Sequence, residues 1–166
     1  MHQYPIVEQL KNFAPEIATF GESISPNLII EFENLYGVQL PCDYKLIISL
    51  INGFSIMGSE VYGIGPTSVT LPLHNVYQFE HFEVSYPQPL YLIPFSPDGG
   101  GNFYCFDTRY QTSNGNSYAI VFWVSNFNYT VEDQPEIVFN TFTDFVQEVI
   151  INWTLEEYDY SGKEKE

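Results

Sequence analysis

Basic residues are scarce in this sequence, which has five Lys and Arg against 21 Asp and Glu and a formal net charge of -16. Such a chain is repelled by nucleic-acid phosphates and by anionic membranes, so we expect no direct binding to either. The same charge attracts basic partners and raises the rate at which they associate. Because acidity also keeps a protein soluble whatever its function, the charge alone fits both a binding role and simple solubility.

Cysteine is nearly absent as well, with only Cys42 and Cys105 and no Cys-x-x-Cys motif. Cys105 lies among aromatic residues in a strand-like segment, which predicts a small buried hydrophobic side chain. No run approaches the roughly 20 apolar residues that span a bilayer. The first residues show no basic segment followed by a long apolar one, so we expect a cytoplasmic protein in which the two cysteines stay reduced.

What the sequence does contain is typical of a globular protein, with 166 residues of which 45% are apolar and 17% aromatic. A chain of this length buries enough apolar surface to offset the entropy of ordering it. It has no internal repeat and no long linker. We expect one domain over residues 1–166, with its core at about 28–155 and a charged tail at 156–166 that frays.

Apolar residues recur at helical spacing in the first half of the chain. Ser25 is a good N-cap with Pro26 at the first helical position, and Gly37 can end that helix in a left-handed conformation. Pro41 opens another helix, which Gly53 ends. The predicted helices are 4–14, 26–36, 41–52 and 73–83.

The second half favours strands and a closing helix. The strand candidates are 60–65, 90–95, 102–107 and 118–124. The last of these is apolar on both faces, which predicts that both sides of the sheet are covered. Thr141 and Asp144 form a capping box before a C-terminal helix. The fold class is therefore α+β, with a central antiparallel sheet flanked by an N-terminal helical portion and a C-terminal helix.

The cluster Asp98, Gly99, Gly100 and Gly101 lies between two predicted strands. A phosphate-binding loop ends in Gly-Lys-Ser/Thr and leads into a helix, whereas Asn102 and a strand follow here. A calcium loop needs several oxygen ligands, and this loop carries one acid. Because Asp can bond its own downstream backbone and Gly adopts positive φ freely, the cluster predicts a hairpin turn.

No residue pattern indicates catalysis or a cofactor. His74 and His81 are seven residues apart, which on a helix separates them by roughly 10 Å, too far to chelate one zinc ion. The sequence has no His-Glu-x-x-His or Gly-x-Ser-x-Gly motif. We therefore expect no catalytic, metal-binding or cofactor-binding residues.

The acidic residues are better candidates as a group. Each one is by default a solvated surface residue, but together they provide a surface for a basic partner. The candidate partner-binding residues, expected in loops and around the sheet, are Glu80, Glu83, Asp98, Glu132, Asp133 and Glu136.

Several segments together resemble the SUKH superfamily, the domain shared by the yeast cell-wall-synthesis regulator and many bacterial immunity proteins. The ordered features are Tyr-Gly-x-x-Leu-Pro-x-x-Tyr, then Asn-Gly, and later Asp-Gly-Gly-Gly-Asn. The resemblance covers about residues 28–155. Its segments are IIEFENLYGVQLPCDYKLIISLINGF (29–54), YGIG (62–65), YLIPFSPDGGGNFYCFD (91–107), YAIVFWV (118–124) and VFNTFTDFVQEVI (138–150).

This resemblance implies an α+β fold without catalysis. Bacterial members similar to this chain are typically immunity proteins that bind and neutralise a cognate toxin, often a nuclease, which needs a basic surface for its substrate. The net charge of -16 fits such a partner. The alternative function is that of an intracellular regulatory scaffold, as in the yeast relative, and the oligomeric state stays open.

Overall fold

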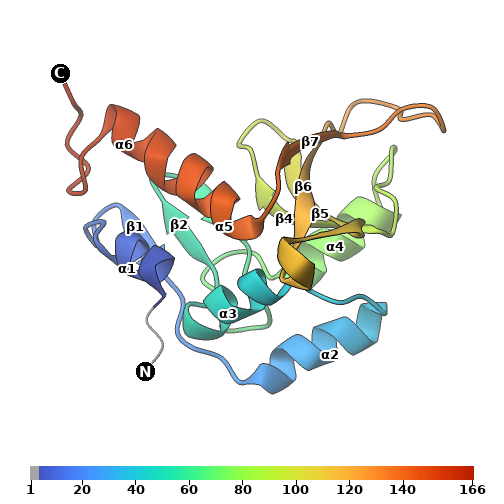
Figure 1. Cartoon of the computed structure of the whole chain (residues 1–166), viewed down its shortest axis with the longest axis horizontal. Helices are drawn as coiled ribbons and strands as arrows, with labels where there is room; N and C mark the ends of the chain where they lie inside the picture. The colour runs from blue at the N-terminus through green and yellow to red at the C-terminus, as the bar shows by residue number, and fades with distance from the viewer. Residues whose placement is uncertain (1–3) are drawn as a thin grey trace.

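The computed structural model describes residues 4–166 and has a mixed α+β fold, as the sequence predicts (Figure 1). Its helices are α1 (Pro5–Lys11), α2 (Pro26–Tyr36), α3 (Cys42–Leu50), α4 (Leu73–Phe82), α5 (Phe142–Phe145), the π-helical segment η2 (Val146–Asn152) and α6 (Trp153–Glu157). Its strands are β1 (Ala18–Phe20), β2 (Phe54–Ile56), β3 (Ser59–Val61), β4 (Leu92–Pro97), β5 (Phe103–Thr112), β6 (Ser117–Trp123) and β7 (Glu136–Phe139), with a 3₁₀ turn, η1 (Ser113–Gly115), between β5 and β6. None of the helices described is long and apolar enough to cross a membrane.

The predicted helices are confirmed, and local residues explain where they start and stop. The Ser25 hydroxyl accepts a hydrogen bond from Asn27 N at 3.3 Å, which satisfies a free N–H at the start of α2. At the other end Gly37 has φ 65°, the left-handed conformation that stops the helix. α3 begins after Pro41 and ends at Leu50, a little before the predicted stop.

The strands form two antiparallel sheets rather than one. The larger has the order β4-β5-β6-β7 and contains three of the predicted strands together with β7, which was not predicted. The smaller, β1-β2-β3, was missed except for the predicted strand 60–65, which overlaps β3 only at residues 60–61. Tyr62 N donates to Phe95 O at 2.9 Å and so joins the end of the small sheet to β4.

One aromatic cluster links the inner face of the larger sheet to the helices. Phe95 of β4 and Phe106 of β5 stack with ring centroids 4.1 Å apart, and the edges of other rings approach them. Phe142 and Phe145 of α5 pack edge-on against Phe95 and are fully buried. Aromatic rings in such edge-on and offset pairs stabilise a core beyond their buried area.

The outer face of the same sheet has a smaller cluster, made of Leu92, Cys105, Val121 and Trp123. Tyr129 of the chain between β6 and β7 stacks on Trp123, with ring centroids 4.1 Å apart. The prediction that β6 is covered on both sides is therefore confirmed. Cys105 is buried as predicted, and both cysteines are free thiols.

The closing helix runs as one continuous rod through α5, η2 and α6, drawn in red in Figure 1. The Thr141 hydroxyl accepts from Asp144 N at 3.0 Å, which confirms the N-cap. Asp43 of α3 adds a second cap, because its Oδ2 accepts from Phe142 N at 3.1 Å and from Thr143 N at 3.3 Å. This contact fixes the closing helix to the helical half of the molecule.

The charged tail does not fray, which corrects the sequence-based expectation. The Asp159 carboxylate accepts backbone hydrogen bonds at 2.9 and 3.0 Å, and Gly162 adopts φ 88°, so the chain turns back on itself. The Tyr160 ring then lies 4.7 Å from that of Phe13, and its carbonyl accepts from Ala14 N at 2.8 Å. The tail therefore packs against the segment that follows α1.

Candidate partner-binding site

The predicted acidic residues fall on several elements, and one of them is not on the surface. Glu83 is exposed at the end of α4, Asp98 in the β4–β5 turn and Glu136 at the start of β7. Glu132 is exposed and Asp133 half-buried in the β6–β7 loop, residues 124–135. The sixth residue, Glu80, is a correction: it lies within α4 and is only 5% exposed. Helical spacing places it on the inward face, one turn beyond the buried Val76.

The Asp98 turn has the geometry of a tight hairpin. Its Oδ1 accepts from Gly100 N at 2.7 Å and from Asn102 N at 2.9 Å. Gly99 and Gly101 have φ 87° and 96°, which L-residues with a side chain rarely adopt. Asn102 Oδ1 also accepts from Ser125 N at 3.0 Å, so the turn contacts the start of the β6–β7 loop.

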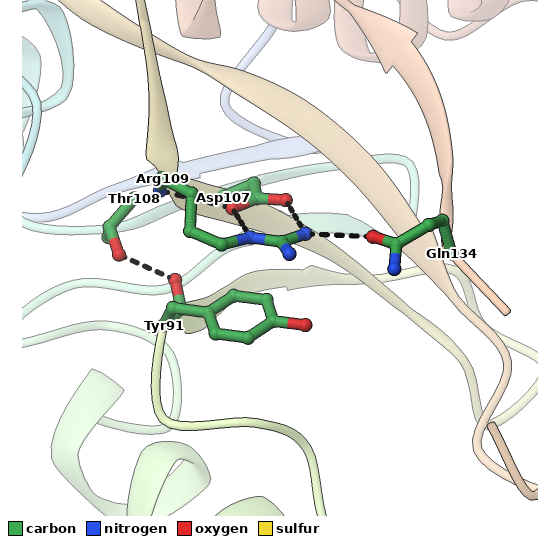
Figure 2. A network of polar contacts seen from close by, with 5 residues as sticks. All are labelled: Tyr91, Asp107, Thr108, Arg109 and Gln134. Atoms are coloured by element: carbon green, nitrogen blue, oxygen red, sulfur yellow. Dashed lines mark hydrogen bonds and ion pairs between the residues drawn. The ribbon is translucent and has the colours of Figure 1, made fainter. Parts of the chain in front are cut away.

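Arg109 lies between Tyr91 and Gln134, which belong to two separate segments (Figure 2). Its Nε and Nη2 donate to the two carboxylate oxygens of Asp107 at 3.0 and 2.9 Å, and the Asp107 side chain is only 1% exposed. This bidentate pair of hydrogen bonds holds the guanidinium in one orientation. The guanidinium lies 3.8 Å from the Tyr91 ring centroid, and Nη2 donates to Gln134 Oε1 at 3.1 Å. Arg109 therefore joins the segment 83–91 to the β6–β7 loop.

Each of these two segments also has its own anchor. In the β6–β7 loop the Asp133 carboxylate accepts from the backbone N–H and the hydroxyl of Thr130 at 2.8 and 2.9 Å. These bonds, the backbone one first, lower the pKa of Asp133. The segment 83–91 is held by His81 of α4, whose Nε2 lies 3.1 Å from Pro89 O and 2.9 Å from the O atom of Leu92, the first residue of β4. Both segments are thus ordered rather than free loops.

Large apolar side chains are exposed beside the acids. Val131 is 98% exposed, Ile137 of the edge strand β7 is 54% exposed and Phe127 is 45% exposed. We call residues 124–137 the β7 surface. Protein interfaces combine a few desolvated apolar anchors with a polar or charged rim, and this surface contains both. The sequence analysis named the acids of this segment as candidates but not its apolar residues, although Phe and Val in an otherwise polar loop would have indicated them.

The β7 surface has no basic residue of its own. Between Lys45 and Lys163 the sequence contains a single basic residue, Arg109. Arg109 is paired with Asp107, and Lys45 with Glu33 at 3.4 Å. The electrostatic potential around the residues between Lys45 and Lys163 is therefore determined mainly by carboxylates.

Among residues 4–166, the histidines and cysteines do not form a reactive centre. His74 is exposed at the start of α4, and His81 is buried with Nδ1 2.7 Å from Tyr77 O. Burial lowers the pKa of His81, and burial raises the pKa of the Cys105 thiol. Within residues 4–166, no group of three His, Cys, Asp or Glu side chains is placed to hold a metal ion.

Comparison with known proteins places this arrangement in a family. A sequence model of the SMI1 / KNR4 family (SUKH-1) matches residues 23–148, about three quarters of the chain. The chain belongs to the SMI1 / KNR4 family (SUKH-1). The matched region of this SUKH-1 chain includes both the Asp98 turn and the β7 surface, whereas α1, β1 and α6 lie outside it.

A solved structure supports the fold of the SUKH-1 chain. It is described as the crystal structure of a protein from Pseudomonas syringae pv. tomato, and it superposes with a TM-score of 0.58 at 17% sequence identity. The match covers 87% of this chain and 96% of that one. No curated protein matches the sequence significantly. SUKH proteins are known from toxin-immunity systems, and in general they are not catalysts.

Proposed function

We propose that this chain is a cytoplasmic, non-enzymatic immunity protein that binds a cognate bacterial toxin and blocks its working site. The observation that carries the proposal is the β7 surface, where Glu132, Asp133 and Glu136 lie beside exposed apolar side chains. The carboxylates attract a basic toxin and orient it, and the apolar side chains supply contact area once water is expelled.

A nuclease is the class of toxin that suits this surface best. An enzyme that cuts nucleic acid needs a basic surface for the phosphates of its substrate. A protein with a net charge of -16 competes for that same surface. Binding there blocks access of the substrate and needs no catalytic group on the immunity protein.

The test is co-expression with the product of the toxin gene next to its own gene. We expect restored growth and a stoichiometric complex on gel filtration. The triple variant Glu132→Gln, Asp133→Asn and Glu136→Gln should lose both. The matched control neutralises three exposed acids elsewhere, Glu8, Glu16 and Glu22, and should retain both.

Unchanged toxicity with no complex for the unmodified protein would overturn the proposal. It would favour the alternative of an intracellular regulatory scaffold, which binds proteins of its own cell. A pull-down from the native cell followed by mass spectrometry distinguishes the two, because it identifies either a toxin or a host protein as the partner.

A further inference from the structure

A small cavity opens between α4, the chain that follows β3 and the start of β5. Its volume is about 190 Å³, and none of its lining residues belongs to the β7 surface. Apolar side chains form most of its wall, among them Val76, Phe79 and Phe103. At its mouth Leu71 is 59% exposed and Phe79 52% exposed.

Two buried polar groups face this apolar space. Glu80 and Tyr62 both line the cavity and are 5% and 4% exposed. Within the described residues, neither the Glu80 carboxylate nor the Tyr62 hydroxyl makes a hydrogen bond or an ion pair. The oxygens of both side chains keep some solvent contact, since neither is among the fully buried atoms without a partner. A carboxylate that has no protein partner and stands against apolar walls is therefore open to a ligand that replaces this solvent.

The chemistry of the cavity defines that ligand. A carboxylate and a phenol oxygen both accept hydrogen bonds, so the ligand brings a cationic donor. The apolar walls suit a flexible hydrocarbon stem that carries the donor inward. A metal ion fits poorly, because one carboxylate and one phenol are far fewer than the roughly six to eight oxygens that Ca²⁺ takes.

We propose that this cavity receives a lysine or arginine side chain of the basic protein partner. The Glu80 carboxylate and the Tyr62 hydroxyl oxygen accept its N–H groups, and Phe79 and Leu71 enclose its stem. The inference rests on the proposed function for the identity of the partner, since the cavity itself specifies only a cationic side chain. It also assigns Glu80 a role different from that of the surface acids: it binds one side chain instead of contributing to a diffuse field.

The first test uses n-butylguanidinium chloride, with neutral n-butylurea of the same shape as its control. We expect saturable shifts of the backbone NMR signals of Phe79, Glu80 and Phe103 with the cation and none with the urea. Glu80→Gln keeps the shape of the side chain and should weaken binding of the cation by about tenfold or more, since charge-assisted hydrogen bonds are lost. Tyr62→Phe removes only the hydroxyl and should weaken binding to a smaller extent.

Glu8→Gln is the matched control, because it removes the same charge from an exposed position outside the candidate partner-binding residues. Equal weakening by Glu80→Gln and Glu8→Gln, or shifts spread over all the acidic segments, would overturn the proposal by showing nonspecific attraction.

The second test uses the toxin complex and separates this inference from the proposed function. A toxin that binds the unmodified protein and the Glu80→Gln variant with equal affinity contradicts the cavity proposal and leaves the function standing. If butylguanidinium binds at Glu80 while no toxin forms a complex, the cation site is supported and the proposed function fails.

Discussion

At the scale of single residues, Glu80 reduces the stability of the protein in a way that depends on pH. Burial raises the pKa of Glu80, because the folded protein disfavours its charged form. The folded state then holds the proton more tightly than the unfolded state. The free energy of unfolding is therefore highest below the unfolded-state pKa of Glu80, and it falls as the pH rises through the folded-state pKa. We expect Glu80→Gln to stabilise the protein at neutral pH by about 1 kcal/mol.

The measurement is urea denaturation of Glu80→Gln and the unmodified protein at several values between about pH 5 and pH 8. The stabilisation by the variant should shrink toward the acidic end, where the carboxyl group becomes protonated in the folded state. Glu83→Gln, which changes an exposed side chain, should give a difference near zero throughout. A gain of Glu80→Gln that is the same at every pH would contradict the assigned cause.

Arg109 acts by its geometry as well as its charge. Arg109→Lys keeps the charge but loses the bidentate hydrogen bonds to both oxygens of the buried Asp107. We expect a loss of about 2 kcal/mol in the free energy of unfolding. Because Gln134 loses its partner too, amide hydrogen exchange should speed up in residues 124–135 more than in β5. Exchange that rises equally in both would mean that Arg109 does not anchor this loop.

The sequence predicts which residues are acidic but not which are buried. Glu80 lies within α4 and Glu83 caps its C-terminal end three residues later, and the packing of α4 against β4 separates their environments. The Arg109 contacts are similarly invisible in the sequence, since Tyr91, Asp107 and Gln134 come from three separate segments. The hairpin role of Asp98 could be predicted because all its partners lie within four residues.

At the scale of elements, the closing helix depends on a cap from a distant helix. Asp43→Ala removes an acceptor shared by Phe142 N and Thr143 N at the start of α5. Because Phe142 N keeps Ser117 Oγ at 3.0 Å, we expect a cost of about 1 to 2 kcal/mol. Thr141→Ala removes one cap and should cost about 1 kcal/mol. Urea denaturation gives both values. Asp43→Asn retains an amide oxygen as acceptor and should be milder than Asp43→Ala; an equal cost would assign the effect to lost packing instead.

The helices were predictable and much of the sheet structure was not, for a physical reason. Helix signals are local: Ser25 and Gly37 bracket α2 within a dozen residues. The strands β1, β2 and β3 have three residues each, too few for alternation to show. They exist because distant segments pair, as Ala18 does with Ile56. The folded tail depends in the same way on Tyr160 meeting Phe13.

At the scale of the whole molecule, charge is distributed unevenly along the chain. Two of the five basic residues, Lys163 and Lys165, lie in the tail that packs beside α1, and another, Lys11, lies in α1 itself. The remaining two are held in ion pairs with Glu33 and Asp107. These three lysines lie among acids of α1 and the tail, such as Glu8, Glu157 and Glu164, whereas the β7 surface contains acids and no basic residue. A basic partner therefore meets less opposing positive charge at the β7 surface.

This uneven charge predicts how salt changes the kinetics of partner binding. Raising the ionic strength shortens the screening length from about 10 Å at 0.1 M to about 3 Å at 1 M. We expect the association rate constant with the toxin to fall by about tenfold or more over that range, while the dissociation rate constant changes little. Stopped-flow measurements across a salt series give both constants.

The two triple variants make the salt experiment specific to a surface. Neutralising Glu132, Asp133 and Glu136, or Glu8, Glu16 and Glu22, changes the net charge by the same amount. If the β7 surface steers association, the first variant loses most of the rate at low salt and most of its salt dependence, whereas the second keeps both. Equal losses in the two variants would show that net charge alone attracts the partner and that the β7 surface does not orient it.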